Sequence, residues 1–150
     1  MIQKSKDDFL EELRKQNNFN VLGVDYGEKK IGLAIFRNEI NLATPLKVFH
    51  KSSGDYADEI TKIINKEKIH GLLIGLPIAT DGTITEISKK VLIFGEQLSK
   101  KIELPIYFFD ERFTTSLANV LLKETNMKRK KRNQIDDMHS ANIILDNFFR

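Results

Sequence analysis

Five apolar segments of the chain have the length and composition of β-strands. Residues 21–26 and 31–36 flank the turn-forming stretch GEKK, which predicts a β-hairpin. Residues 43–49 predict a third strand. The runs 69–77 and 104–109 are almost continuously apolar, which is typical of strands covered on both faces. The chain therefore begins with an antiparallel pair and has its most buried strands later.

Apolar residues recur at helical spacing in four further segments: residues 55–68, 83–102, 117–121 and 135–149. In the second of these, Thr83 and Glu86 have the spacing of a capping box, which predicts the start of that helix. The last helix is expected to open at Asp136 and Asp137, after a run of basic residues, because acids are favoured at a helix start.

This order of elements predicts an α/β fold with a mixed five-stranded sheet and helices on both faces. A chain of 150 residues fits one domain, which we assign to residues 21–150. Residues 1–20 are expected to form an N-terminal extension that is weakly helical or disordered. Its stretch DDFLEELRKQ is compatible with a helix packed on the domain, a partner-binding arm or a disordered leader.

Composition narrows the class of protein. Hydrophobic residues at 41% and charged residues at 30% are ordinary values for a globular domain. The absence of cysteine excludes disulfides and thiolate metal sites. The apolar runs are far shorter than a membrane span, and the N-terminus is too charged for a signal peptide. We therefore expect no membrane contact and a cytoplasmic location.

The basic character of the chain is local. The net charge is +3, yet five consecutive cations lie in one tract: Lys128, Arg129, Lys130, Lys131 and Arg132. Such a tract is compatible with a solvated loop or with a contact to a polyanion.

Three sets of acids carry the candidate chemistry. Asp25 lies inside an apolar strand, where a carboxylate needs a proton, a partner or a metal, unless it accepts hydrogen bonds from the amides of the following turn. Asp110 and Glu111 directly follow a buried strand, and Asp136 and Asp137 form the third set. Carboxyl ends of parallel strands meet at one edge of a sheet, so these acids could converge there.

Converging carboxylates repel one another unless a hard cation neutralises them, and Mg²⁺ or Mn²⁺ prefers oxygen ligands. Ions held in this way can orient a water molecule for phosphodiester hydrolysis. With a basic tract nearby, nucleic acid is the natural substrate.

Four ordered motifs resemble those of a known family: VDYGEKKIGLA, GLPIATDGT, FFDERFTT and IDDMHSANIIL. Together they cover residues 21–149 and are similar to the YqgF/RuvX family of Holliday-junction resolvase-like proteins, whose members are also described as nucleases that mature the small-subunit ribosomal RNA precursor. The resemblance implies an RNase H-like fold, which agrees with the predicted order of elements.

The resemblance also implies roles for individual residues. The catalytic, metal-binding acids would be Asp25, Glu111 and Asp137, the last chosen because it lies eight residues before the Leu of IIL. Asp110 would be a further ligand or a partner of one, and His139 either perturbs the metal site or lies at the surface. Substrate contacts are expected from Lys29, Lys30, Thr83, Arg112, Lys128, Arg129, Lys130, Lys131 and Arg132.

Two of these contacts have structural alternatives. Arg112 could hold a phosphate or form an ion pair within the fold. Thr83 and the glycine-containing turn before it could bind a phosphate at the next helix start, or only shape the connection.

The function predicted is a metal-dependent endonuclease that processes the 5′ end of pre-16S rRNA, with ribosomal particles as further partners. The alternatives are a resolvase of branched DNA and a non-catalytic binder of nucleic acid. Cutting a junction symmetrically needs a homodimer, whereas trimming one RNA end needs only a monomer. ATP handling is disfavoured, because folds that use a similar Asp-x-Gly turn close two domains around the nucleotide.

Overall fold

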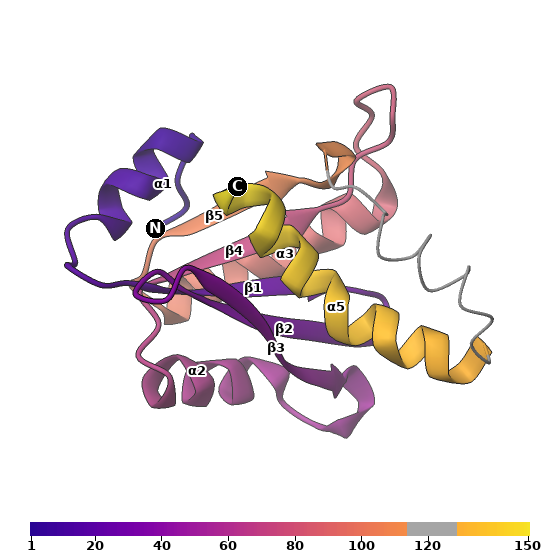
Figure 1. Cartoon of the computed structure of the whole chain (residues 1–150). Helices are drawn as coiled ribbons and strands as arrows, with labels where there is room; N and C mark the ends of the chain where they lie inside the picture. The colour runs from indigo at the N-terminus through magenta and orange to yellow at the C-terminus, as the bar shows by residue number, and fades with distance from the viewer. Residues whose placement is uncertain (114–128) are drawn as a thin grey trace.

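The protein is built on a five-stranded sheet whose order is β3-β2-β1-β4-β5 (Figure 1). This computed structural model describes residues 1–113 and 129–150, and their side chains except those of Ser53, Phe113 and residues 129–138. β1 pairs antiparallel with β2 and β2 with β3, whereas β4 and β5 run parallel to β1. The predicted mixed sheet is confirmed. Its strands are β1 Asn20–Tyr26, β2 Lys30–Arg37, β3 Leu42–His50, β4 Gly71–Leu76 and β5 Ile106–Asp110.

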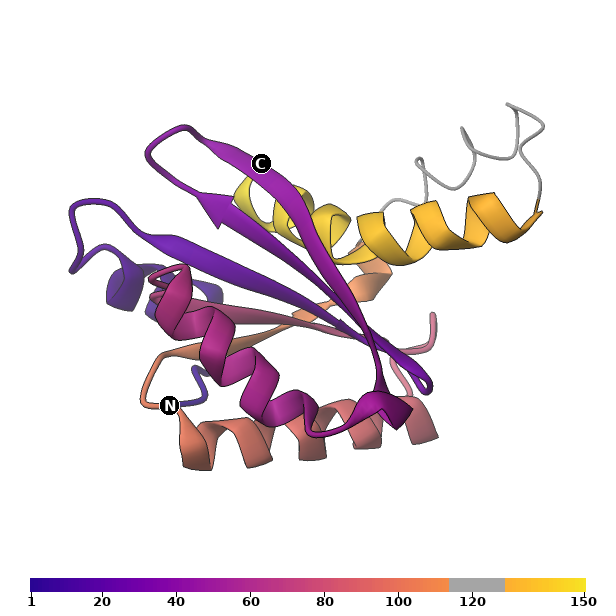
Figure 2. The same ribbon diagram turned by 90° about the horizontal axis from the view of Figure 1, so that it is seen from below.

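Helices cover both faces of the sheet, as predicted (Figure 2). α2 and α3 pack on one face, and α5 packs on the other together with α1. The helix expected around residues 117–121 lies outside the described residues. The described helices are α1 Lys6–Leu13, α2 Tyr56–Lys66, α3 Glu86–Lys101 and α5 Arg129–Phe149, with short 3₁₀ turns η1 Lys51–Ser53 and η2 Glu111–Phe113.

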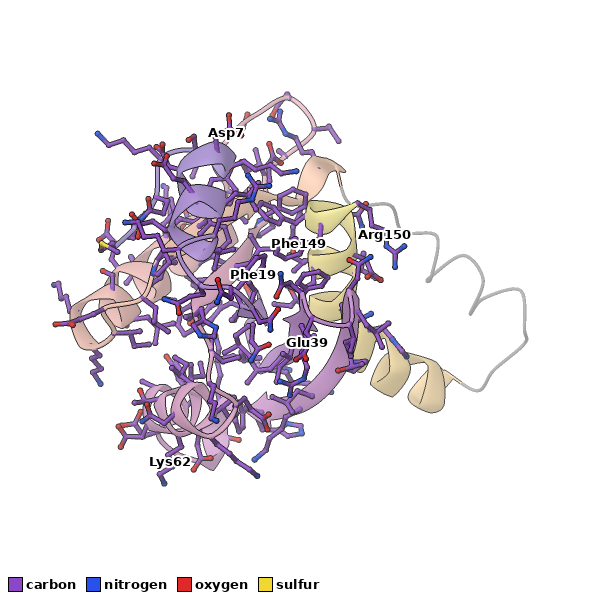
Figure 3. All side chains as sticks on the ribbon, turned by 60° about the vertical axis from the view of Figure 1, so that its left-hand side comes forward. Asp7, Phe19, Glu39, Lys62, Phe149 and Arg150 are labelled. Carbon is purple, nitrogen blue, oxygen red and sulfur yellow. The ribbon has the colours of Figure 1, made fainter. Side chains whose placement is uncertain are left out.

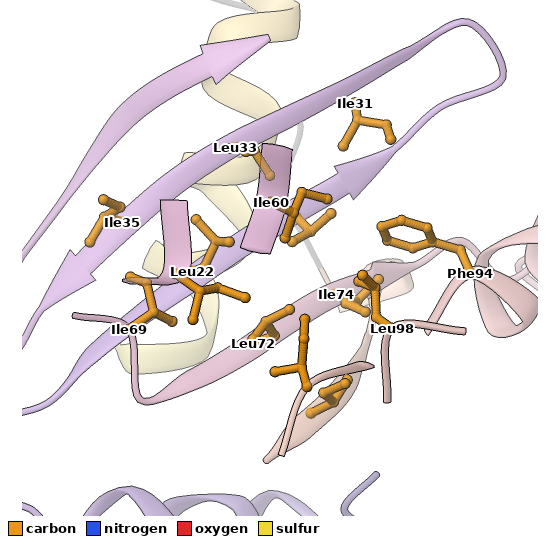
Figure 4. Packing of buried hydrophobic residues seen from close by; sticks show 14 of the residues in the cluster. Leu22, Ile31, Leu33, Ile35, Ile60, Ile69, Leu72, Ile74, Phe94 and Leu98 are labelled. Carbon is orange, nitrogen blue, oxygen red and sulfur yellow. The ribbon is translucent and has the colours of Figure 1, made fainter. Parts of the chain in front are cut away.

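Alternation along β1 divides the core into two layers. Leu22 and Val24 face α2 and α3, where they join the larger hydrophobic cluster (Figure 4). Val21 faces α5 on the other side. Gly23 also lies on the α5 side, and a Cβ atom there would come within 2.6 Å of Leu145 Cγ. Because β1 has no side chain at this point, α5 packs directly on the strand.

The N-terminal segment forms a helix that is part of the core. Ser5 caps α1, and Phe9 and Leu13 are fully buried. The Phe9 ring lies 5.8 Å from Tyr107 and 5.7 Å from Phe148 of α5. Three interpretations were left open for this segment, and the structure shows the first: a helix packed on the domain.

The C-terminal end of α5 is closed by aromatic side chains. The Phe149 ring stacks on Phe36 at 3.9 Å and lies 6.1 Å from Phe19 (Figure 3). Lys6 donates a hydrogen bond to the Phe148 carbonyl at 3.0 Å, which satisfies one of the free carbonyls at the helix end. The last turn of α5 is thus fixed at the start of β1, and the helix extends from there toward the carboxyl end of β1.

Two predicted helix starts are wrong. α3 begins at Glu86, and its capping box pairs Thr85 with Ser88, because Ser88 is fully buried and also donates to the Pro77 carbonyl. α5 begins at Arg129, so Asp136 and Asp137 lie inside it and do not open it. Lysine and arginine are good helix formers, so residues 129–132 of the basic tract extend the helix and do not interrupt it.

Among the described residues, no helix combines the length and the apolar character needed to cross a membrane.

Candidate active site

Asp25 and Glu111 lie at the same edge of the sheet. Asp25 follows the last β1–β4 pair, Val24 with Ile74, and is therefore level with Gly75 in the neighbouring strand. Glu111 directly follows β5, whose Phe109 pairs with Gly75. Because β1, β4 and β5 are parallel, their carboxyl ends bring the two acids to either side of β4.

Gly75 makes room for the Glu111 carboxylate. A Cβ atom at Gly75 would lie 2.5 Å from Ile144 Cδ1 and closer still to Glu111 Oε1. The carboxylate therefore lies on the backbone of β4, beside an apolar side chain of α5. This is an observation that the sequence analysis missed, and the glycine inside the apolar run LLIGL was the available signal.

Asp25 and Glu111 are two negatively charged groups held close together, and this affects the pKa of Glu111. The pKa of Glu111 is raised from 4.5 to about 7, most of all by burial and then by the negative charges of Asp25 and Asp110. A carboxyl group with this pKa is partly protonated at neutral pH. Burial combined with a neighbouring acid is a typical environment of functional carboxylates, because a bound cation can relieve both costs.

Asp110 is engaged by Arg112. Its carboxylate accepts hydrogen bonds from the Arg112 backbone N–H at 2.9 Å, from Nε at 2.9 Å and from Nη2 at 2.6 Å. These contacts lower the pKa of Asp110. An ion pair within the fold, one of the two roles considered for Arg112, is therefore present.

Arg112 also approaches the loop between β4 and α3. Its Nη1 atom would lie 3.4 Å from a Cβ atom at Gly82, which has a positive φ of 87°. Hydrogen bonds with Thr83 lower the pKa of Asp81, and the charge of Arg112 adds to this. Thr83 lies in this loop. Its N–H bonds to Asp81 Oδ1 at 2.9 Å, and it lies outside the cap of α3.

Lys29 and Lys30 lie beside Asp25. They line a groove of about 310 Å³ together with Asp25, Glu28 and the surrounding turn. A groove of about 470 Å³ between α2 and α3 is larger, but its lining includes neither Asp25 nor Glu111. The structure thus brings two of the predicted substrate-binding cations next to the first candidate acid.

The other predicted site residues are described only in part. Asp137 and Arg129–Arg132 lie in α5, but their side chains are outside the described part of the structure, as is Lys128 entirely. His139 is half-buried on α5. The backbone of Asp137 lies one helical turn before Ala141, which is fully buried against the sheet.

The described side chains contain no group of three acids or histidines that could hold a metal ion. Asp25 and Glu111 nevertheless supply carboxylate oxygens, the ligand type that Mg²⁺ and Mn²⁺ prefer. A half-buried acid beside a second acid fits a divalent cation.

Comparison with known proteins identifies the family. Residues 19–150 match the family model described as "RuvX: Holliday junction resolvase". The chain belongs to the RuvX family. This confirms the resemblance on which the site residues were assigned.

Relatives of this RuvX-family chain carry a nuclease name. It is 42% identical over 148 residues to a protein of Orientia tsutsugamushi (strain Ikeda) named "Putative pre-16S rRNA nuclease", a match that covers 97% of this chain and 92% of that protein. It is 44% identical over 130 residues to a protein of Rickettsia bellii (strain OSU 85-389) with the same name, covering 86% and 84%. The Orientia match extends into the N-terminal segment that contains α1.

The fold is also that of a solved resolvase. The structure of T. thermophilus RuvC in complex with Holliday junction substrate superposes with a TM-score of 0.51, covering 87% of this chain and 91% of that one. At 14% sequence identity this likeness concerns the fold alone. The RNase H-like architecture predicted from the sequence is confirmed.

Proposed function

We propose that this RuvX-family chain is a divalent-metal-dependent endonuclease that hydrolyses phosphodiester bonds at the 5′ end of pre-16S rRNA. The observation that carries the proposal is the Asp25–Glu111 pair at the carboxyl edge of the sheet. The names of the relatives support a pre-16S rRNA substrate. A cytoplasmic location and contact with ribosomal particles fit that substrate.

Asp25, Glu111 and Asp137 would hold Mg²⁺ or Mn²⁺. The bound ion would supply Lewis-acid stabilisation of the phosphate oxygens and a water with a lowered pKa. Each acid comes from a different rigid element, namely β1, the end of β5 and α5. Because Gly75 and Ile144 fix the Glu111 carboxylate between the sheet and α5, that ligand is oriented before substrate arrives.

Asp110 would position Arg112 and would not bind the metal itself, because three hydrogen bonds from Arg112 already occupy its oxygens. The guanidinium is thereby held beside the β4–α3 loop and the site. Lys29 and Lys30 would bind substrate phosphates on the other side of Asp25, along the groove that they share with it.

A resolvase of branched DNA is the second candidate, favoured by the description of the family model. A third is a binder that keeps the fold without cleavage. A resolvase needs two sites in a homodimer, so the oligomeric state in solution separates it from a monomeric RNA nuclease.

The test compares wild type with Asp25→Asn and Glu111→Gln on a 5′-extended pre-16S RNA fragment and on a four-way DNA junction, with Mg²⁺, with Mn²⁺ and with EDTA. Glu96→Gln is the matched control, since Glu96 is an exposed acid on α3. We expect metal-dependent cleavage of the RNA that both site variants lose and the control retains. Cleavage of the junction alone would support the resolvase. Equal binding by all variants without cleavage of either substrate would support the non-catalytic binder.

A further inference from the structure

Lys51 is a half-buried lysine at the same end of the sheet as the acid pair, but on the other face. It begins η1 directly after β3, and its backbone N–H bonds to the Lys29 carbonyl at 3.0 Å. Its ammonium lies over the Tyr26 ring, 3.5 Å from the centroid. Tyr26 follows Asp25 in β1, so their side chains point to opposite faces. Lys51 is therefore just across the end of the sheet from the candidate acids.

The position of Lys51 is fixed by aromatic packing. The Tyr26 ring lies 4.5 Å from Phe94 of α3, and the Tyr56 ring of α2 lies 6.0 Å from the same phenylalanine. A cation over an aromatic face is attracted by the ring, which holds the flexible side chain in one place. The ammonium is thus presented near the first turns of α3, where Lys90 lies.

Lys51 forms no ion pair with a carboxylate of the described residues. Burial lowers the pKa of the Lys51 ammonium, and the positive charge of Lys90 lowers it too. Glu28 attracts this charge, but no carboxylate among the described residues lies within 4.0 Å of the ammonium of Lys29, Lys51 or Lys90. The three lysines form what we call the end patch.

Other lysines on the same helices are arranged differently. Lys89, next to Lys90 on α3, pairs with Glu86 at 3.3 Å. Lys62 on α2 pairs with Glu59 at 3.8 Å and points away from the sheet (Figure 3). Both are exposed ion pairs between residues one turn apart, a kind that contributes little to stability. The end patch instead takes its cations from the β1–β2 turn, η1 and α3, and none of them is paired with an acid of the described residues.

We propose that the end patch binds phosphates of the RNA strand beyond the scissile phosphate, so that the strand passes from the Asp25–Glu111 site over the β1–β2 turn to Lys51 and Lys90. The proposal rests on the proposed function for the location of the scissile phosphate. Lys29 lies in the turn and joins the two sides, since it lines the Asp25 groove and its carbonyl binds the Lys51 amide. Phosphate contacts of this kind raise affinity without reading sequence.

The test measures binding of a 5′-extended pre-16S RNA fragment by fluorescence anisotropy in EDTA, where metal-dependent cleavage is absent. The variant Lys51→Ala/Lys90→Ala is compared with Lys62→Ala/Lys89→Ala, which makes the same charge change on paired lysines. We expect the first to weaken binding about tenfold or more and to flatten the slope of log K against log salt by about 1.4 to 1.8, the value for two lost phosphate contacts. The control should change affinity less than about twofold. Equal losses in both variants would overturn the proposal, because net charge alone would then explain them.

Two further variants guard against a folding effect. Lys51→Arg keeps the cation over the Tyr26 ring and should bind RNA as wild type does. Lys90→Ala alters only an exposed helix position, so it should keep the wild-type melting temperature and still flatten the slope by about 0.7 to 0.9. An unchanged slope in Lys90→Ala would refute the patch even if the double variant failed to fold.

The patch and the nuclease can fail separately. Weakened RNA binding by the double variant, together with no cleavage by wild type under any metal, would keep the patch and reject the nuclease. If cleavage depends on Asp25 but the double variant binds RNA as wild type does, the nuclease stands and the patch is rejected. A loss seen on a four-way DNA junction and absent on RNA would overturn the assignment of the patch to RNA.

Discussion

Glu111 should make the metal-free protein less stable at alkaline pH, and Glu111→Gln should remove that cost. The pKa of Glu111 is raised to about 7 from 4.5, first by burial and then by the charge of Asp25. The folded state therefore holds the proton more tightly than the unfolded state. The stabilising effect of the protonated form is complete below about pH 4.5 and is lost as pH rises through about 7.

The magnitude follows from the shift. One pKa unit corresponds to about 1.4 kcal/mol, so ionising Glu111 in the folded state costs at most about 3.5 kcal/mol. We would measure the free energy of unfolding in urea with EDTA present. The value for Glu111→Gln should equal that of wild type near pH 4.5 and should be higher than wild type by up to that amount at pH 8. Comparing wild type with the variant at each pH cancels the titration of groups that they share.

Two controls make this prediction specific. Glu96→Gln removes an exposed acid on α3 and should show no difference from wild type that depends on pH. Adding Mg²⁺ at pH 8 should stabilise wild type and not Glu111→Gln, because a ligand that binds the folded state raises its stability. If the free energies of unfolding of Glu111→Gln and wild type differ by the same amount from pH 4.5 to 8, the reasoning is refuted. Burial and the charge of Asp25 would then not affect the ionisation of Glu111.

Three further predictions concern the site and its support. Gly75→Ala should displace Glu111 from β4, cost about 1–3 kcal/mol in urea unfolding and weaken Mg²⁺ binding measured by calorimetry; normal Mg²⁺ affinity would contradict this position of the carboxylate. Phe9→Ala should cost about 3–5 kcal/mol by urea unfolding, because Phe9 is fully buried against Tyr107 and Phe148, and an unchanged midpoint would show that α1 is dispensable. Mg²⁺ affinity of wild type should rise about tenfold from pH 6 to 8 as Glu111 loses its proton, and a flat profile by calorimetry would exclude it as a ligand.

The sequence was enough to predict that acids gather at the carboxyl end of the parallel strands, because the topology of parallel strands determines where their ends lie. Buried parallel strands are read as continuous apolar runs, and the acids that follow them must meet at their carboxyl ends. These rules placed Asp25 and the neighbours Asp110 and Glu111 at one edge, and the family resemblance singled out Glu111 from that pair. The role of Gly75 was not, because a glycine within an apolar run does not reveal which side chain from another element will lie over it.

The helix starts were harder to predict, because local signals compete there. Thr83 and Glu86 have a capping spacing, yet Thr85 and Ser88 form the cap, since Ser88 is buried and also bonds to the Pro77 carbonyl. At α5 the charge of the tract suggested a loop, whereas its helix propensity decided the outcome. Whether Arg112 binds phosphate or Asp110 likewise depends on geometry that its sequence neighbours do not specify.

The acid pair is tolerated because the elements that hold it are fixed by contacts elsewhere. Gly23 and Gly75 let α5 lie directly on β1 and β4, and Leu145 and Ile144 fill the space that their missing side chains leave. At its far end α5 is locked by Phe9 of α1. Repulsion between Asp25 and Glu111 is therefore not relieved by moving the strands apart, and a bound cation would reduce it. The contacts that hold the two acids in place would thus also suit the pair to bind a metal.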